Sequence, residues 1–197
     1  MIKLSSVAVA VLAGGQGSRI GGGKPLIALG GTTLIGRAYE RATGWSPSAA
    51  IAIRSPEQLG SYHLPWVGDD AGIDGPLAGL AAALRWACNQ DAQALLTIPC
   101  DMPFIPADLP LRLISGIGDS SASVASSGGR LHPVCALWRS TACDELKDYC
   151  ASGRRSLKGF AEHLGYAEVA WPVVSHDPFF NINNLADLAE AERMLGF

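Results

Sequence analysis

The stretch Val7–Lys24, with the sequence VAVAVLAGGQGSRIGGGK, decides how the chain begins to fold. Its first half is an apolar run of the kind that forms a buried strand, and this run ends at Leu12-Ala13. A glycine-rich loop with two cations, Arg19 and Lys24, follows at once. Because glycines let backbone N–H groups approach an anion closely and the cations add positive charge, the pattern predicts a loop that binds nucleotide phosphates.

Two familiar phosphate-binding motifs do not fit this loop. A Walker A loop, G-x-x-x-x-G-K-[ST], needs a glycine where Ser18 stands and a hydroxyl where Pro25 follows Lys24. A dinucleotide fingerprint, G-x-G-x-x-G, fits from Gly15 but ends on Ile20. The loop therefore belongs to neither class, and a flexible surface loop after a core strand remains the alternative interpretation.

The composition indicates a single domain over residues 1–197 with a sizeable core, because 48% of the residues are hydrophobic and 17% are charged. The net charge of −3, without a basic run, argues against a nucleic-acid binder. Five cysteines without a C-x-x-C spacing argue against a structural zinc site or a disulfide scaffold. With no cleavable signal and no apolar run of membrane length, we expect a cytoplasmic protein that binds neither nucleic acid nor membranes.

Apolar runs alternate with helical patterns, which predicts an α/β fold with three αβα layers around a mostly parallel, Rossmann-like sheet. Strands are expected at Val7–Ala13, Ala49–Ile53, Ala92–Ile98, Ser121–Ala125, Pro133–Trp138 and Tyr166–Trp171. Helices are expected at Thr33–Thr43, Pro76–Cys88, Asp108–Ile114, Asp144–Ala151, Ser156–Leu164 and Asn184–Leu195. Ligands of such sheets bind at the carboxyl ends of the strands, so the glycine loop marks the expected ligand edge.

A rigidly held aspartate is expected at the same edge. Asp101 stands between Pro99 and Pro103, shortly after the strand predicted at Ala92–Ile98. Mg²⁺ prefers one or two carboxylates together with phosphate oxygens, so Asp101 is a candidate to hold this ion against phosphates in the Gly14–Lys24 loop. A turn residue or a helix cap is the alternative interpretation.

Other polar groups are weaker candidates on spacing alone. Asp69-Asp70 precedes the helix predicted from Pro76 and is a candidate ligand contact, with a solvated loop as the alternative. Arg154-Arg155 forms a small cationic patch suited to phosphate, although surface arginines are commonly just solvated. Asn181 and Asn183 would face one side of an extended segment and could bind a polar ligand, although Asn183 also suits a turn or a cap.

The catalytic motifs that are present and absent indicate a class of reaction. No Ser/His/Asp order and no H-E-x-x-H motif is present, and His132, before Pro133, is interpreted as structural. The pattern fits phosphoryl or nucleotidyl transfer better, because that chemistry depends on positioning and charge neutralisation rather than on an activated side-chain nucleophile.

Several motifs occur together and in order along nearly the whole chain. They are Leu12-Ala13-Gly14-Gly15, Arg19, Gly22-Gly23-Lys24-Pro25, Gly75-Pro76-Leu77-Ala78-Gly79, Pro99-Cys100-Asp101-Met102-Pro103, His132-Pro133, Arg154-Arg155-Ser156 and Asn181-Ile182-Asn183. In this combination the chain resembles the molybdenum cofactor guanylyltransferase family, the MobA family. The first loop alone is shared by many nucleotidyltransferases, whereas the later motifs are more specific.

The resemblance implies a fold of the nucleotide-diphospho-sugar transferase type. It also implies that GMP is transferred from GTP to the phosphate of molybdopterin (Mo-molybdopterin), with Mg²⁺, which forms the guanine dinucleotide cofactor and pyrophosphate. The implied partners are GTP, molybdopterin, and proteins that deliver molybdopterin or accept the finished cofactor. The alternatives are a related nucleotidyltransferase that uses CTP or a sugar-phosphate acceptor, and a catalytically silent module that binds a nucleotide or pterin.

The resemblance also implies roles for matching positions. Arg19 and Lys24 would hold the triphosphate, with Lys24 stabilising charge on the α-phosphate, and Asp101 would bind Mg²⁺. Asp69 would contact the nucleotide. Guanine would be read, chiefly through backbone groups, by Leu12, Ala13, Gly14 and Gly15. The side chains that would lie toward the pterin substrate are Arg155, Asn181 and Asn183.

Two positions depart from the family pattern. Many relatives have an aspartate where Gly23 precedes the loop lysine, and some have an asparagine near the nucleotide where this chain has Arg54. Base or ribose contacts at Arg54 are therefore open, as is the choice between Asp69 and Asp70.

Overall fold

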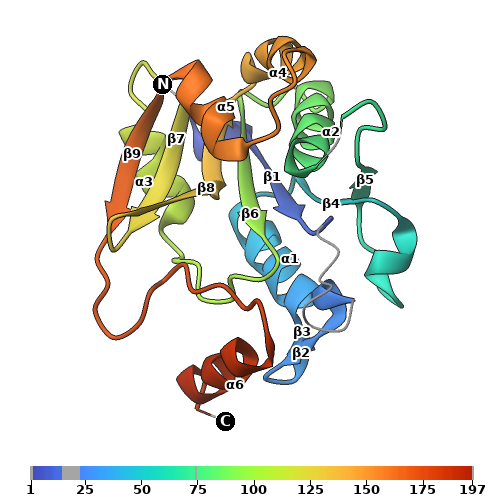
Figure 1. The fold of residues 1–197 in the computed structure, drawn as a ribbon, viewed down its shortest axis with the longest axis vertical. Coiled ribbons are helices and arrows are strands. Elements are labelled where there is room, and N and C mark those ends of the chain that lie inside the picture. The colour runs from blue at the N-terminus through green and yellow to red at the C-terminus, as the bar shows by residue number, and fades with distance from the viewer. Residues whose placement is uncertain (1, 15–22, 74, 197) are drawn as a thin grey trace.

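The apolar run that opens the chain forms the strand β1 (Val7–Leu12), which lies inside a seven-stranded sheet (Figure 1). The computed structural model describes residues 2–14, 23–73 and 75–196; of the predicted site residues, Gly15 and Arg19 lie outside these ranges. Within them the strand order is β5-β4-β1-β6-β8-β7-β9. The other strands are β4 (Ala49–Ile53), β5 (Trp66–Gly68), β6 (Ala94–Pro99), β7 (Ala122–Ser127), β8 (Arg130–Arg139) and β9 (Tyr166–Trp171).

The directions of these strands confirm the predicted, mostly parallel sheet. β1 pairs in parallel with β4 and with β6, β4 pairs in parallel with β5, and β7 with β9. β8 runs antiparallel to its two neighbours, β6 and β7. The carboxyl ends of β4, β1 and β6 therefore meet at one edge, where ligands of such sheets bind.

The two faces of the sheet follow from the alternation of side chains along β1. Val7, Val9 and Val11 lie in one apolar cluster with side chains of α1 (Leu34–Trp45) and α3 (Leu109–Gly116). Ala8 and Ala10 lie in a second cluster on the opposite face. This second cluster is completed by α2 (Pro76–Asn89), α4 (Ala142–Ala151) and α5 (Leu157–Leu164). Helices thus cover both faces, and the expected three αβα layers are confirmed.

Local sequence signals explain where the first helix begins and which face it buries. The Thr33 side chain caps α1 by accepting a hydrogen bond of 3.1 Å from the Gly36 N–H. The apolar positions at helical spacing are all buried in α1: Leu34, Ile35, Ala38 and Ala42. The same holds in α2 for Leu77, Leu80, Ala81 and Leu84. The periodicity of the sequence therefore predicted the buried face of both helices correctly.

A small satellite packs below the sheet in Figure 1. The hairpin of β2 (Ala28–Leu29) and β3 (Thr32–Thr33) lies beside the last helix, α6 (Leu185–Met194). A third apolar cluster joins Leu29 of β2, Leu34 at the start of α1, Ile182 before α6 and Ala191 of α6. Short 3₁₀ helices complete the described elements: η1 (Leu4–Ser6), η3 (Lys24–Leu26) and η4 (Pro56–Leu59).

The strand β8 is longer than predicted and contains an irregularity. Ala136 pairs with Val124, but the next pair along β7 joins Ala125 to His132, so residues 133–135 have no partners of their own in the register. Pro133 lies in this bulge, where its missing N–H costs no ladder hydrogen bond. Bulges commonly redirect side chains beside ligand sites, and here the bulge carries Val134 to the ligand edge.

All five cysteines are free thiols. Burial raises the pKa of the Cys100 thiol to about 12, so this group is an inert part of the core at neutral pH. In the described ranges, none of the helices has the length and apolar character needed to span a bilayer.

Candidate active site

Two neighbouring cavities lie at the carboxyl ends of β4, β1 and β6. We call them the Asp69 cavity, of about 250 Å³, and the Asp101 cavity, of about 230 Å³. The Asp69 cavity is lined by Leu12, Gly14, Ala52, Arg54, Asp69, Gly75, Pro76, Gly79, Val134 and Leu157. The Asp101 cavity is lined by Leu12, Ala13, Lys24, Pro25, Pro99, Cys100, Asp101, Val134 and Asn181. Because both share Leu12 and Val134, they adjoin along one groove.

Lys24 and Asp101 meet directly in the Asp101 cavity. The distance between Lys24 Nζ and Asp101 Oδ2 is 2.5 Å, and the two side chains are 12% and 19% exposed. Gly23 directs the chain into this contact with a left-handed backbone conformation, φ 62°, that suits glycine. The prediction that the glycine loop and Asp101 share one edge of the sheet is confirmed for Lys24, whereas Arg19 lies outside the described residues.

Asn181 and Asn183 reach the same place from the segment that precedes α6. The Ile182 N–H donates to the Asp101 carbonyl at 2.9 Å and ties this segment to the end of β6. Asn183 Oδ1 accepts from Lys24 Nζ at 3.4 Å, and Asn181 lines the Asp101 cavity. Both amides therefore gather at one side, as their spacing predicts.

The oxygen atoms of this cavity suit a hard cation. Asn181 Oδ1 is buried and has no hydrogen-bond partner among the described residues. An unsatisfied buried acceptor costs about 1–3 kcal/mol, so a ligand or ion that meets it is favoured. Together with the Asp101 carboxylate it fits Mg²⁺, which takes oxygen ligands, few from protein and the rest from water and phosphate. In the described ranges there is no cluster of three or more acidic, histidine or cysteine ligands.

A hydrogen-bonded chain anchors the segment that carries the two asparagines. Ser127 Oγ donates to Asp177 Oδ1 at 2.6 Å and lies 2.8 Å from His132 Nε2. Since the single hydroxyl proton points to the carboxylate, the imidazole N–H is the donor to Ser127. The His132 ring also stacks on Phe179, with centroids 4.6 Å apart. Burial lowers the pKa of His132, which suits the structural role expected for it.

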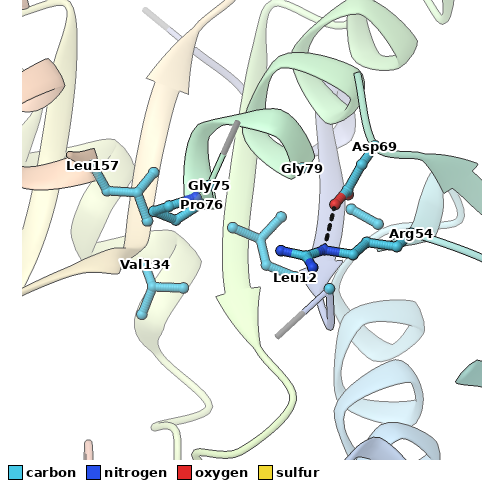
Figure 2. Close-up of a pocket in the computed structure, with 10 residues that line it drawn as sticks. Leu12, Arg54, Asp69, Gly75, Pro76, Gly79, Val134 and Leu157 are labelled. Carbon is cyan, nitrogen blue, oxygen red and sulfur yellow. Dashed lines mark ion pairs between the residues drawn. The ribbon is translucent and has the colours of Figure 1, made fainter. Parts of the chain in front are cut away.

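Asp69 faces its cavity with one oxygen unpaired (Figure 2). Its Oδ2 lies 3.6 Å from Arg54 Nε, while its buried Oδ1 has no hydrogen-bond partner within the described chain. A Cβ on Gly14 would lie 3.1 Å from Oδ2, and one on Gly79 would lie 3.3 Å from Oδ1, so a larger residue at either position would press on this carboxylate. Burial raises the pKa of Asp69, and the nearby Arg54 opposes part of that rise.

Asp70 is engaged elsewhere. Its carboxylate pairs with Arg85 and accepts from the Gly72 N–H at 2.8 Å. The hydrogen bond from Arg85 is the main reason why the pKa of Asp70 is lowered. The geometry thus favours Asp69 over Asp70 as the carboxylate available to a ligand in the Asp69 cavity, although its role in binding stays a prediction.

The remaining predicted residues are less clearly placed at the groove. Arg155 is exposed just before α5, near Cys150, and is not among the described residues that line either cavity. Leu12, Ala13 and Gly14 lie at the groove, whereas Gly15 lies outside the described residues. Their predicted contacts with a ligand stay predictions.

Sequence reasoning left out some groove residues. Val134 and Leu157 line the Asp69 cavity, and no short-range pattern marked either. Gln58 was also missed: its Nε2 donates to the Ala13 carbonyl at 3.2 Å. Arg54, whose contacts the sequence left open, follows β4 directly and lines the Asp69 cavity.

The opposite pKa shifts of the two aspartates predict opposite effects of neutralising them. The pKa of Asp69 is raised on folding. The free energy of unfolding therefore falls as the pH rises from the ordinary pKa of this carboxyl through its raised value. Asp69→Asn should therefore raise Tm at pH 7, and the gap should close as the pH falls below the ordinary pKa of aspartate. Thermal unfolding across that pH range measures both.

Asp70→Asn is the matched control. The pKa of Asp70 is lowered, so its charge adds stability that is present above its ordinary pKa and lost as pH falls through the lowered value. This variant should unfold at a lower temperature than wild type at pH 7. Equal Tm changes for the two variants, or a Tm difference for Asp69→Asn that ignores pH, would contradict the assignment.

Comparisons with known proteins show which family the chain is similar to. Residues 9–168 match a family described as the MobA-like NTP transferase domain. A molybdenum cofactor guanylyltransferase from Cereibacter sphaeroides is 38% identical over 187 residues, covering 94% of this chain and 95% of that protein. One from Rhodopseudomonas palustris (strain BisB5) is 41% identical, covering 93% and 91%. Molybdopterin-guanine dinucleotide biosynthesis protein A from Archaeoglobus fulgidus superposes with a TM-score of 0.77 at 27% identity, over 96% and 98% of the chains.

Proposed function

The chain belongs to the MobA-like NTP transferase family, and from this premise we propose that it is a molybdenum cofactor guanylyltransferase. In this proposal it transfers GMP from GTP to the phosphate of Mo-molybdopterin and releases pyrophosphate. The observation that carries the proposal is the groove in which the Lys24–Asp101 pair adjoins the Asp69 cavity. One end suits phosphates and a cation, and the other has the size and polarity for a nucleoside.

The proposed reaction requires groups that stabilise negative charge, and it requires no general base. A phosphate oxygen of the acceptor forms a bond to the α-phosphorus of GTP, while the bond to the bridging oxygen breaks and pyrophosphate leaves with the electron pair. The attacking oxygen is already anionic, so no side chain has to remove a proton. The negative charge that builds on the α-phosphate needs a donor beside it, and the ammonium of Lys24 is the group suited to this.

Asp101 and Asn181 are the residues that would hold Mg²⁺. When bound, the ion neutralises charge on the phosphates. Asp101 also orients Lys24 before the nucleotide arrives, since the two side chains are in contact in the free protein. Arg19 is proposed to bind the triphosphate as well.

The substrates are proposed to lie on the two sides of the reacting phosphate. Asp69 would contact the nucleoside, with support from its unpaired, buried oxygen. Asn181, Asn183 and Arg155 would lie toward the pterin, the first two with support from their position beside Lys24 and Asp101. Proteins that deliver molybdopterin or accept the product are the partners that this function implies.

A product assay with different nucleotides tests the proposal. Purified protein is incubated with molybdopterin, Mg²⁺ and GTP, ATP or CTP, and pyrophosphate release is followed while the product is identified by mass. We expect release with GTP, dependent on molybdopterin, and a product that carries GMP. Thermal unfolding with each nucleotide should show the largest stabilisation with GTP and Mg²⁺, because a ligand of the native state raises Tm.

Two results would overturn this assignment. Pyrophosphate release with CTP alone, or release that needs a sugar phosphate instead of molybdopterin, would indicate a related nucleotidyltransferase. Binding of GTP without any turnover would indicate a nucleotide-binding module without catalytic activity. Omission of molybdopterin from the GTP reaction is the internal control for simple hydrolysis.

A further inference from the structure

We infer that Gln58 is a positioning residue: its side-chain amide holds the end of β1 apart from β4 and so fixes the backbone from which the glycine-rich segment starts. This role rests on the proposed function, because it serves the nucleotide of that reaction. Gln58 is not among the described residues that line either cavity, so it acts through another residue. That residue is Ala13, which lines the Asp101 cavity and precedes Gly14 of the Asp69 cavity.

The hydrogen-bond ladder between β1 and β4 is interrupted at its carboxyl end. The Ala13 N–H donates to the Ala52 carbonyl at 2.9 Å, as the parallel register requires. If the regular pattern continued, the Ala13 carbonyl would accept from the Arg54 N–H. The Gln58 amide stands between these two groups instead. Its Oε1 accepts from the Arg54 N–H at 2.8 Å, and its Nε2 donates to the Ala13 carbonyl at 3.2 Å.

The inserted amide widens the gap between the two strand ends. Two bonds, of 2.8 and 3.2 Å, take the place of the single N–H···O bond of about 2.9 Å that joins neighbouring strands. The Ser55 N–H also donates to Gln58 Oε1, at 3.4 Å. With two N–H groups facing one end of the amide and a carbonyl facing the other, the partners themselves assign its oxygen and its nitrogen. The strands therefore separate where the groove begins, and no backbone group is left unpaired by it.

The short helix η4 gives Gln58 a rigid base. Leu59 of this helix is only 4% exposed and belongs to the apolar cluster on the α1 side of the sheet. Gly60, at the end of η4, lies so close to η3 that a Cβ on it would be 3.0 Å from Leu26 Cδ1. η4 thus contacts the residue before the glycine-rich segment, through Gln58, and also the turn that begins with Lys24, through Leu26.

A backbone that is fixed before the ligand arrives binds it more tightly, because the cost of ordering is not subtracted from the binding free energy. Ala13 and Lys24 both line the cavity in which the phosphates are proposed to bind. Without the amide bridge, the end of β1 would take several positions, and only a fraction of them would suit the nucleotide. Gln58 should therefore affect the affinity for GTP and not the chemical step, since Lys24 and Asp101 keep their own contact.

The test is Gln58→Leu, which keeps the approximate size of the side chain and removes all its hydrogen bonds. In steady-state turnover with molybdopterin, KM for GTP should rise about fivefold, the usual effect of one lost hydrogen bond. Both kcat and the KM for molybdopterin should stay within about twofold of wild type. A merely structural role would reduce the amount of folded enzyme, which lowers the apparent kcat and leaves KM unchanged. Gln90→Leu, at the exposed end of α2, is the matched control.

Gln58→Glu separates the two halves of the bridge. A carboxylate still accepts from the Arg54 and Ser55 N–H groups, but it has no proton to donate to the Ala13 carbonyl. KM for GTP should therefore rise about as much as in Gln58→Leu. The increase should persist at raised ionic strength, which screens the added charge from the nucleotide. A wild-type KM for Gln58→Glu would show that the bonds within η4 and to Arg54 suffice, and it would exclude the role assigned to the bond with Ala13.

The outcomes separate this role from the proposed function. If Gln58→Leu is folded and keeps the wild-type KM for GTP, Gln58 does not position the nucleotide, and the proposed function stands. A fall in kcat at unchanged KM also excludes the positioning role, because it indicates a contribution to folding alone. If wild type does not turn over GTP, the proposed function is wrong, and the role of Gln58 in it is wrong as well. Thermal unfolding of each variant confirms that it is folded.

Discussion

Lys24→Ala should lower kcat/KM for GTP by about a thousandfold, or about 4 kcal/mol, while the protein stays folded. Lys24 is the cation among the described residues that line the Asp101 cavity, and it contacts Asp101 there. As the α-phosphate is attacked, charge builds on its oxygens, and a preorganised ammonium in a poorly hydrated site is worth most at that moment. Removal of one such donor typically costs two to three orders of magnitude.

The loss should fall on kcat more than on KM. Other groups also hold the ground-state triphosphate, whereas the extra charge on the α-phosphate is present only in the transition state. Steady-state kinetics with GTP and molybdopterin separate the two constants. Lys158→Ala is the matched control, because this lysine on α5 is 60% exposed and pairs only loosely with Glu162, at 3.8 Å. An unchanged kcat/KM for Lys24→Ala would exclude the proposed role.

Asp101→Ala should abolish turnover and leave the fold intact. Asp101 is the acidic side chain among the described lining residues of its cavity, so its removal takes away the proposed anchor for Mg²⁺ as well as the partner of Lys24. We expect activity at least a thousandfold below wild type, since the charge on the phosphates is then neither neutralised by a held ion nor met by an oriented lysine.

Asp101→Asn sharpens this test, because it keeps the size of the side chain and removes its charge. In wild type, Mg²⁺ should increase the Tm shift that GTP produces, and in Asp101→Asn this increment should be lost. Asp119→Ala, in the exposed turn after α3, controls for the loss of an acidic residue. Equal trace turnover by wild type and Asp101→Ala would instead favour the catalytically silent module.

The periodicity of apolar residues, and the rule that ligands bind at the carboxyl ends of parallel strands, were enough to predict much of this fold. β4 and β9 have the predicted bounds, Ala49–Ile53 and Tyr166–Trp171, because continuous or alternating apolar runs of that length have few alternatives. By contrast, β5 and the β2–β3 hairpin were missed. They have three and two residues per strand, which is too short for any period to emerge, and tertiary pairing rather than local propensity creates them.

The sequence likewise predicts one part of the candidate site and not the other. The meeting of Lys24 and Asp101 follows from two neighbouring parallel strands that end at one edge, and this can be read from sequence. The choice between Asp69 and Asp70 cannot, because it depends on Arg85, fifteen residues away on α2, which engages Asp70. Val134 escapes sequence reasoning for a similar reason: the bulge in β8 is a property of its pairing with β7.

Internal carboxylates along the groove would compete with an incoming anion for the cations there. In the free protein, Lys24 pairs with Asp101 and Arg54 pairs with Asp69. Cations without internal partners would bind any polyphosphate, including the pyrophosphate product. An incoming phosphate would have to displace the Asp101 carboxylate from Lys24, and in the proposed function a metal ion held at Asp101 would then compensate that carboxylate. In the proposed function, each internal acid would therefore favour binding of the complete nucleotide with its metal over binding of pyrophosphate alone.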